Sequence, residues 1–502
     1  MYLLGLDIGT TNWKANLYDL KGRLIISVSH PAPVKKDKSG NSYYDANQMW
    51  KIFCVLIRQA VIKVKNPELI KAISFASMAE AGCLADENGL PLTHIIPWFD
   101  KRTIPMMKKI LRKISKKEIF GITGVNLTHI FSICKIIWFK EHERIAFKKA
   151  AKWVCVPDYL IKRISGEWAT DYSIASRTAL FDIKNKKWSK KMLDFAGIKE
   201  SFLPKAFPSG TFVGNVTEKA SKECGLSINT KVVLGGHDHV CGSLGAGLFS
   251  EGKALDSMGT AESICVPLEN IDNLNKYFNS GFSFGCYTFG SMYYAMAGLY
   301  YSGGIIEWLM REYYETDQKK SKIYKTMIKD AKGSKPGSNG LYVLPHWLGI
   351  GAPYGLREAK GMIIGFHPDT TKGDLINAAY EGLAYEYRLL IETAEKTVGF
   401  KAKEIIVIGG GAKNKLWLKR KADILGRTLT VPEVSESVCF GAALLAGLGS
   451  NTIKDPVSFV NRNKKELIKA GKKLKDFYNN EYLNHYMRIY RQNLPYWKNK
   501  TT

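Results

Sequence analysis

The sequence predicts an α/β protein with two lobes around a central cleft. Its 502 residues exceed what one hydrophobic core normally holds. Strand-like and helix-like segments alternate in both halves of the chain. A strand–turn–strand segment near the N-terminus, Asp7-Ile-Gly-Thr10, is echoed about half a chain later at Gly259-Thr260. We therefore expect a first lobe at residues 1–248, a second lobe at 249–450, and a basic, helical extension at 451–502.

The N-terminal hairpin is the first candidate binding site. Apolar residues at 3–6 and a second strand-like run at 14–20 flank a turn formed by Gly9-Thr10-Thr11. Such a turn offers free backbone N–H groups and two hydroxyls to an anion. Asp7 comes just before it. A carboxylate beside a phosphate site indicates a divalent metal between them, because two anions repel each other.

The elements that follow have the order of a known ATPase lobe. A helix is expected from 47 to 63, with Asp45 or Asn47 as its N-cap, because its apolar residues fall on one face. A strand at 72–76 and a basic helix that opens at 95–102 come next. Together with the N-terminal strands, this order resembles one lobe of the actin/hexokinase-type ATPases.

Four residues of the first lobe have the chemistry of a polyol site: Glu80, Trp98, Asp100 and Arg102. Carboxylates accept hydrogen bonds from neighbouring sugar hydroxyls, an arginine donates them, and an aromatic face covers the C–H side of the sugar. The spacing alone favours a plainer interpretation. In that interpretation Trp98 is a core residue and Asp100 is the N-cap of the helix behind it.

The middle of the first lobe contains helices and one loop. Residues 115–151 are basic and mostly helical in pattern. A later helix is expected to stop at Gly166, since glycine commonly occupies the position just after a helix. The polar segment Thr170-Asp171-Tyr172-Ser173 is expected to be a loop.

Asp238 is the candidate general base. A strand leads into Gly235-Gly-His-Asp-His239, and a helix of small residues at 240–247 follows. An Asp at such a turn is accessible to a substrate, where it would take the proton of a sugar hydroxyl as that oxygen attacks phosphorus. A metal site is the alternative, because His237 and His239 would share a face in an extended segment. No further clustered ligand appears nearby in the sequence.

The second lobe contains three glycine-rich features. The Gly259-Thr260 turn repeats the phosphate-binding chemistry of the first hairpin, and a helix opens at 300–308. After a buried strand at 405–408, Gly409-Gly-Gly411 lets a ligand approach the backbone closely at the start of a helix. A Rossmann unit would need a different glycine spacing. A helix of small residues at 431–446 ends the lobe.

Composition limits the remaining classes of function. The net charge of +27 would suit a nucleic-acid binder, but the basic residues are dispersed and form no recognition motif, so no nucleic-acid partner is expected. The nine cysteines are scattered without a CxxC pair, which is typical of free thiols in a reducing cytoplasm. No apolar run has membrane-spanning length, and we expect no signal peptide and a cytoplasmic location.

Taken together, these motifs resemble the FGGY family of carbohydrate kinases over nearly the whole chain up to about Gly449. The residues that carry the resemblance are Asp7-Ile-Gly-Thr-Thr11, Trp98-Phe-Asp-Lys-Arg102, Gly166-Glu-Trp-Ala-Thr-Asp-Tyr-Ser173, Gly236-His-Asp238, Gly259-Thr260, Gly409-Gly-Gly-Ala412 and Glu436-Ser-Val-Cys-Phe-Gly-Ala-Ala443. The resemblance implies two ribonuclease-H-like lobes, ATP and Mg²⁺ as cofactors, and a small-molecule sugar or polyol substrate. It leaves room for a homodimer, although the sequence carries no information on oligomeric state.

The resemblance also assigns roles by position. Asp238 matches the catalytic base, and Asp7 matches the carboxylate that acts on magnesium through water. The positions matching the phosphate-binding and nucleotide-binding residues are Thr10, Thr11, Lys14, Gly259, Thr260, Gly303, Glu307, Gly410, Gly411 and Asn414. The positions matching the sugar side are Glu80, Trp98, Asp100, Arg102 and His239.

Two departures from the family pattern concern the substrate. Ser77-Met-Ala-Glu80 is neither the Gln-Met-His of xylulose kinases nor the Arg-Glu-Thr of glycerol kinases, and His239 replaces the Gln that follows the base in glycerol kinases. We therefore expect a substrate other than xylulose or glycerol. A catalytically silent sugar or nucleotide sensor on the same fold is the alternative to a kinase, although Asp7, Asp238 and both Gly-Thr turns are intact.

Overall fold

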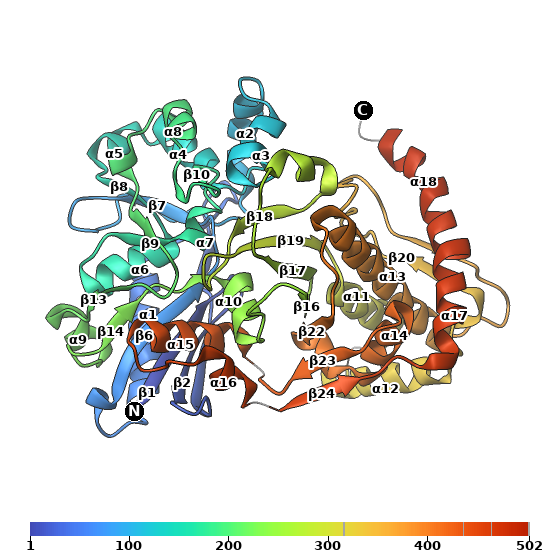
Figure 1. Cartoon of the computed structure of the whole chain (residues 1–502). Coiled ribbons are helices and arrows are strands. Elements are labelled where there is room, and N and C mark those ends of the chain that lie inside the picture. Colours follow the sequence, from blue (N-terminus) through green and yellow to red (C-terminus); the bar gives the residue numbers. More distant parts are fainter. Residues whose placement is uncertain (315–316, 435, 463, 500–502) are drawn as a thin grey trace.

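The chain folds into two lobes that lie side by side (Figure 1). The structure is a computed structural model that describes residues 1–314, 317–434, 436–462 and 464–499. Ser435, within the helix expected at 431–446, lies outside the described residues, as do Asn463 and the last three residues of the expected extension. Within the described residues, each lobe is built on one seven-stranded sheet. The predicted two-lobed α/β architecture is confirmed.

The first sheet contains the N-terminal hairpin. Its strand order is β13 (Phe212–Asn215), β14 (Lys231–Val233), β6 (Ile70–Ser77), β1 (Tyr2–Ile8), β2 (Asn12–Asp19) and β3 (Leu24–Pro31), and β15 (Gly236–His237) also pairs with β6. Helix α1 (Ala46–Val61) covers one face. Of the two candidate caps, Asp45 is the N-cap, because its side chain accepts hydrogen bonds from the N–H groups of Asn47 and Gln48.

A group of helices completes the first lobe. These are α2 (Ile104–Leu111), α3 (Lys116–Thr123), α4 (Ser132–His142), α5 (Arg144–Lys149), α6 (Val156–Ser165), α8 (Lys190–Ala196) and α9 (Glu218–Cys224). The helical character predicted for 115–151 is confirmed. Helix α6 ends at Gly166 as predicted, since this glycine has the left-handed φ of 83° that a residue with a side chain rarely adopts.

The second sheet has the strand order β18 (Ser283–Cys286), β19 (Tyr293–Leu299), β17 (Glu262–Leu268), β16 (Lys253–Met258), β22 (Glu404–Ile408), β23 (Leu429–Pro432) and β24 (Lys465–Ile468). The principal helices of this lobe are α11 (Gly303–Tyr313), α12 (Lys320–Gly333), α13 (Lys372–Val398) and α14 (Lys415–Leu425). Among the described residues, no helix combines the length and the apolar character needed to cross a membrane.

The two sheets repeat the same pattern of strand pairing. In the first lobe β1 pairs antiparallel with β2 and parallel with β6, and in the second lobe β16 pairs antiparallel with β17 and parallel with β22. The strands at one edge of each sheet also correspond, because β13 pairs antiparallel with β14 and β24 pairs antiparallel with β23. The echo between the two Gly-Thr turns is therefore part of a repeated fold.

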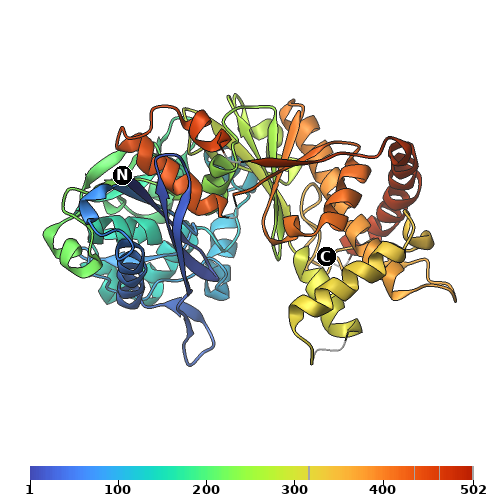
Figure 2. The ribbon, with the colours of Figure 1, turned by 90° about the horizontal axis from the view of Figure 1, so that it is seen from below.

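Helix α15 (Ser437–Gly449) crosses from the second lobe to the first sheet, as Figure 2 shows. It packs on β1, β6 and α10 (Asp238–Gly245) with backbone in contact with backbone. A Cβ atom added to Gly5 would lie 2.0 Å from the Cys439 carbonyl oxygen, and one added to Gly441 would lie 2.0 Å from the Cys241 carbonyl oxygen. The small residues predicted for this helix allow that approach.

The segment after Ser450 differs from the expected surface extension. Its helices are present as α16 (Pro456–Asn461), α17 (Lys472–Asn480) and α18 (Met487–Asn499), but β24 joins the second sheet between them. Tyr478, Tyr482, Tyr486 and Tyr490 are buried in one cluster with Tyr385 of α13. Their spacing of four residues forms an apolar stripe among the lysines, which the basic composition concealed.

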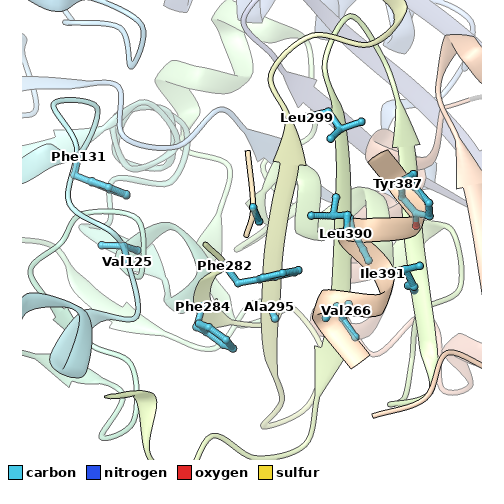
Figure 3. Packing of buried hydrophobic residues seen from close by; sticks show 14 of the residues in the cluster. Val125, Phe131, Val266, Phe282, Phe284, Ala295, Leu299, Tyr387, Leu390 and Ile391 are labelled. Atoms are coloured by element: carbon cyan, nitrogen blue, oxygen red, sulfur yellow. The ribbon is translucent and has the colours of Figure 1, made fainter. Parts of the chain in front are cut away.

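One hydrophobic cluster connects the lobes (Figure 3). Phe131 and Val125 of the first lobe lie beside Phe282 and Phe284, which come from the second lobe at strand β18. A backbone hydrogen bond from Phe284 N to Gly124 O (2.8 Å) fastens this contact. The lobes are therefore joined by apolar packing as well as by the helix α15.

The packing of α15 is testable at Gly441. We expect Gly441→Ala to lower the free energy of unfolding by about 1–3 kcal/mol, because its Cβ would meet the α10 backbone. Gly333→Ala is the control, since no described heavy atom lies within 4 Å of its added Cβ, and its effect should stay within about 0.5 kcal/mol. Denaturant unfolding measures both variants. Equal stability of the two would contradict the described contact between α10 and α15.

Candidate active site

Three parallel strands bring the candidate residues of the first lobe to one edge of the sheet. Asp7 is level with Ala76, and both Ile8 and His237 are level with Ser77, because β1 and β15 each pair parallel with β6. The carboxyl ends of parallel strands are where α/β sheets bind ligands. Asp238 follows directly as the first residue of α10.

Asp238 is held in place while its side chain stays accessible. Its Oδ1 accepts a hydrogen bond from His239 N (2.7 Å) and lies 3.2 Å from Nε2 of His237. The side chain of Asp238 is 23% exposed, whereas that of His237 is 6% exposed. Burial lowers the pKa of His237, so its imidazole is neutral at neutral pH. The sequence prediction of an accessible carboxylate at this turn agrees with the geometry.

The segment predicted as a polar loop at 170–173 is instead buried and structured. Thr170 and Asp171 belong to strand β9 (Ala169–Asp171), and α7 (Tyr172–Ala175) follows. Asp171 caps α7 and accepts a hydrogen bond from the Ser173 hydroxyl, whose oxygen accepts one from His237 N (2.8 Å). The polar side chains are therefore used inside the fold, where they hold the turn that carries Asp238.

One oxygen of the Asp7 carboxyl is buried without a partner. This oxygen, Oδ1, has no hydrogen-bond partner among the described residues. Burial and the neighbouring Asp238 raise the pKa of Asp7 to about 8, although Lys14 acts in the opposite direction. The free protein therefore favours the protonated form of Asp7 more than an ordinary carboxyl would.

Lys14 lies directly across the hairpin from Asp7 and pairs with a residue that the site prediction missed. Its Nζ is 2.6 Å from Oε2 of Glu436, just before α15. Glu436 belongs to a motif noted in the sequence, but nothing in its own neighbourhood indicates that it meets the first hairpin. Helix α15 brings it there by packing on the first sheet.

The two Gly-Thr turns have different surroundings. The Oγ1 of Thr10 accepts a hydrogen bond from Trp98 Nε1 (2.9 Å), so the indole lies beside the first turn. Trp98 is 37% exposed, and Thr11 is also exposed. In the second turn, Gly259 and Thr260 are exposed and their carbonyl oxygens accept hydrogen bonds from the first residues of α11. Gly303 N donates to Gly259 O over 3.0 Å.

The glycine run of the second lobe lies beside the second turn, because β22 pairs parallel with β16. A Cβ on Gly409 would lie 2.5 Å from Met258 O, whereas Gly410 has no described heavy atom within 4 Å of an added Cβ. Gly411 packs against Met258. The open space at Gly410 leaves the backbone free to receive a ligand.

Asn414 and Glu307 have partners within the protein. The buried amide of Asn414 caps α14 by accepting from Trp417 N (3.1 Å) and donates to the Tyr380 hydroxyl (2.9 Å). Glu307 is exposed on α11 and forms an ion pair with Lys320 (2.7 Å). The structure therefore uses the Asn414 side chain to build the fold.

On the sugar side, Glu80 is buried and forms an ion pair with Arg177 (2.7 Å), which sequence reasoning missed. Glu80 has a φ of 62°, a left-handed conformation that costs a residue with a side chain roughly 1–2 kcal/mol. Such strain is found at functional sites when surrounding contacts maintain it. Arg177 lies four residues after Ser173, but nothing in that segment indicates a partner 97 residues away in the chain.

Asp100 and Arg102 bind each other. Arg102 Nε lies 2.8 Å from Asp100 Oδ1, and Asp100 also caps the helical turn at 101–103, as the plainer interpretation predicts. Both residues bind the backbone of Ser42 at the start of strand β5 (Ser42–Tyr44). The pair fastens that strand to the sugar-side segment.

His239 points toward the second lobe, with Nδ1 3.4 Å from the hydroxyl oxygen of Ser263 on β17. Its ring lies 5.4 Å from that of His237, as expected if the two share a face. Among the described side chains, however, no group of three or more His, Cys, Asp and Glu residues is arranged to hold a metal ion. Of the candidate residues in the first lobe, His239 is thus the one whose hydrogen bond reaches the second hairpin among the described contacts.

The geometry defines a class of protein: a two-lobed α/β fold in which each lobe presents a Gly-Thr hairpin and the first lobe brings the carboxyls of Asp7 and Asp238 to one edge of its sheet. Comparison with known proteins identifies the family. The profile of the N-terminal domain of the FGGY family of carbohydrate kinases matches residues 2–245, and that of its C-terminal domain matches residues 257–450. The chain therefore belongs to the FGGY family of carbohydrate kinases, enzymes that transfer phosphate to an alcohol group and use ATP as co-substrate.

Individual relatives act on different sugars. The chain is 29% identical to a xylulose kinase of Staphylococcus xylosus over 448 residues, which cover 89% of this chain and 91% of that protein. It is 31% identical to a glycerol kinase of Thermococcus gammatolerans over 463 residues, which cover 89% of each. The crystal structure of xylulose kinase from Rhodospirillum rubrum superimposes with a TM-score of 0.90 at 22% identity, covering 99% of this chain and 100% of that one. This last likeness concerns the fold alone.

The raised pKa of Asp7 predicts a pH-dependent stability. Its pKa rises from 3.8 in the unfolded chain to about 8 in the folded protein, so the stability it contributes is lost as pH rises through this window. Asp7→Asn lacks this loss. Without added divalent cation, we expect the melting temperature of Asp7→Asn minus that of the unchanged protein to increase from about pH 5 to about pH 8 and then level off. A constant difference across this range would contradict the burial of Asp7.

Proposed function

We propose that this carbohydrate kinase transfers the γ-phosphate of ATP to a hydroxyl of a ketose, a polyol or a sugar acid, with Asp238 as the general base. The observation that carries the proposal is the contrast between two neighbouring carboxyls. Oδ1 of Asp7 is buried and lacks a partner among the described residues, whereas the side chain of Asp238 is 23% exposed and its Oδ1 is oriented by His237 and His239. A general base must reach the proton that it removes, and Asp238 satisfies this requirement.

The phosphates of ATP would be bound between the two hairpins. Backbone N–H groups at the Thr10 and Thr260 turns and the charge of Lys14 suit an anion, and the open backbone at Gly410 suits the nucleoside. Glu436 holds the Lys14 side chain next to the first turn. Positioning of this kind supplies most of the catalysis in phosphoryl transfer.

Asp7 fits a magnesium ion that arrives with the nucleotide. Magnesium is usually held by one or two protein carboxylates together with substrate phosphates and water, so a larger ligand cluster is not required. The unpartnered Oδ1 of Asp7 and its raised pKa are the features that a cation would relieve. When bound, the ion would neutralise charge on the transferring phosphate.

In the transfer step, Asp238 accepts the proton of the attacking hydroxyl while the oxygen forms its bond to phosphorus and the bond to ADP breaks. His237 orients Asp238 without competing for the proton, because burial lowers the pKa of its imidazole and makes it the weaker base. Trp98, Glu80 and His239 would contact the sugar, while the Asp100–Arg102 pair shapes that side by holding Ser42. The departures at 77–80 and at His239 point to a substrate other than xylulose or glycerol.

The base assignment is tested with Asp238→Asn. We expect the variant to fold and bind ADP as the unchanged protein does, but to lose sugar phosphorylation by at least about 10²–10⁴-fold, because an amide cannot accept the proton. A coupled assay of ADP release over a panel of ketoses, polyols and sugar acids measures turnover.

Asp194→Asn is the matched control, since Asp194 is exposed on α8 and pairs with Lys190. It should turn over normally. Near-normal turnover by Asp238→Asn would rule out Asp238 as the base. If the unchanged protein binds ADP yet phosphorylates no member of the panel, the silent-sensor alternative is correct and the proposed activity is wrong.

A further inference from the structure

A fully buried set of charges lies directly beneath the second hairpin. Nζ of Lys421 on α14 is 2.6 Å from Asp256 Oδ2 on β16 and 2.7 Å from Glu262 Oε1 on β17. All three side chains have 0% exposure. We call these residues the buried triad. A lysine buried between two carboxylates is rare in a core and needs a reason beyond packing.

The first lobe shows that this position can be filled without charge. The two hairpins can be aligned at the residue pair nearest to each turn. In the first lobe this pair is Ile8 on β1 and Trp13 on β2, and in the second lobe it is Met258 on β16 and Glu262 on β17. Glu262 therefore corresponds to Trp13, and Asp256 corresponds to Leu6. Trp13 and Leu6 are both completely buried. The same arrangement of strands can therefore have apolar side chains at the positions where the second lobe has charged ones. Buried ion triads are often no more stabilising than the apolar residues that replace them.

The buried triad connects three segments that line the proposed nucleotide site. Glu262 also accepts a hydrogen bond from the Ser302 hydroxyl (2.6 Å), and Ser302 immediately precedes α11. The N–H groups of Ser302 and Gly304 donate to the Thr260 carbonyl, and that of Gly303 donates to the Gly259 carbonyl. Lys421 comes from α14, the helix that follows the glycine run at 409–411. Hairpin, α11 and α14 therefore meet at one point.

The buried triad is held by hydrogen bonds of fixed direction. Lys421 Nζ donates to Asp256 and to Glu262, and Glu262 accepts a further bond from Ser302. Burial raises the pKa of Asp256, although Lys421 acts in the opposite direction. The two carboxyl groups more than offset the effect of burial on Lys421 and raise its pKa. Because such bonds are directional, they restrict the arrangement of the three segments more than apolar contacts do.

We propose that Asp256, Glu262 and Lys421 are positioning residues that hold the Gly259-Thr260 turn and the start of α11 in the conformation that receives the nucleotide phosphates. This inference rests on the proposed function, because it takes the second turn to be a phosphate site. It assigns a role to residues that do not touch the ligand. It also explains why the second lobe retains ions where the first lobe has Leu6 and Trp13.

The test separates positioning from stability. Lys421→Met alone should be destabilised, because it leaves buried carboxyls without a cation. The triple variant Asp256→Leu, Glu262→Met, Lys421→Met copies the apolar solution of the first lobe. We expect its melting temperature to match or exceed that of the unchanged protein. We expect its Kd for ADP to increase about 10- to 100-fold, because the turn and α11 are less well fixed. Its Kd for adenosine, measured by calorimetry, should change by less than about twofold.

Two further variants sharpen the result. Ser302→Ala removes the hydrogen bond that links Glu262 to the start of α11. The variant keeps the ion pairs of Lys421, and it should weaken the binding of ADP more than that of adenosine. Lys190→Met is the control, since Lys190 lies far along the chain on α8 and both partners of its ion pair with Asp194 are exposed. It should bind both ligands normally.

The outcomes distinguish this inference from the proposed function. If the triple variant folds and binds ADP as tightly as the unchanged protein, or weakens ADP and adenosine equally, the positioning role is overturned. If the triple variant does not fold, Ser302→Ala decides. A Kd for ADP that increases more than the Kd for adenosine supports the positioning role, and an equal change in both overturns it. Failure of the proposed function appears elsewhere, as an unchanged protein that binds ADP and phosphorylates no sugar.

Discussion

The structure depends on the backbone contact of α15 with β1 and α10. At Gly5, Gly245 and Gly441 a Cβ atom would come within 2.0 Å of a backbone oxygen across this contact. Because no side chain separates the elements, α15 lies deep against the first sheet, and its start delivers Glu436 to Lys14. The same contact seats α10, whose first residue is Asp238. A larger residue in the contact would displace Asp238 and Glu436, the partner of Lys14, together.

The charges at the site are unbalanced in the free protein, and this imbalance suits the reaction. Asp7, Asp238 and Glu436 are three carboxyls beside a single lysine, and burial and the neighbouring Asp238 raise the pKa of Asp7. In the unfolded chain the Asp7 carboxyl ionises at its ordinary pKa, so this arrangement lowers the stability of the folded protein at neutral pH. A phosphate-bound cation would meet this demand. The folded protein is thus less stable because of the same carboxyl that a bound cation would stabilise.

The two lobes solve a common structural problem in different ways. Each has a hairpin in which the strand before the turn also pairs with a parallel neighbour, so each turn projects from the same edge of its sheet. Beneath the first turn the core is apolar, and beneath the second it contains the buried triad. The first hairpin carries Asp7 and Lys14 opposite each other beside its turn, whereas the second is connected to α11 and α14 by directed hydrogen bonds.

The sequence by itself determined the features that neighbouring residues encode. Glycine and threonine between two strand-like runs define each turn, glycines before Asp238 define an accessible strand-to-helix corner, and these local rules sufficed for the two-lobed fold. Tertiary structure alone decided which distant groups meet: Lys14 with Glu436, Glu80 with Arg177, and Lys421 with Asp256 are separated by 422, 97 and 165 residues. It also decided that the basic tail adds a strand and a buried tyrosine stripe. The physical reason is that periodicity and turn chemistry specify an element and its buried face, while the partner of a charge depends on how whole elements pack.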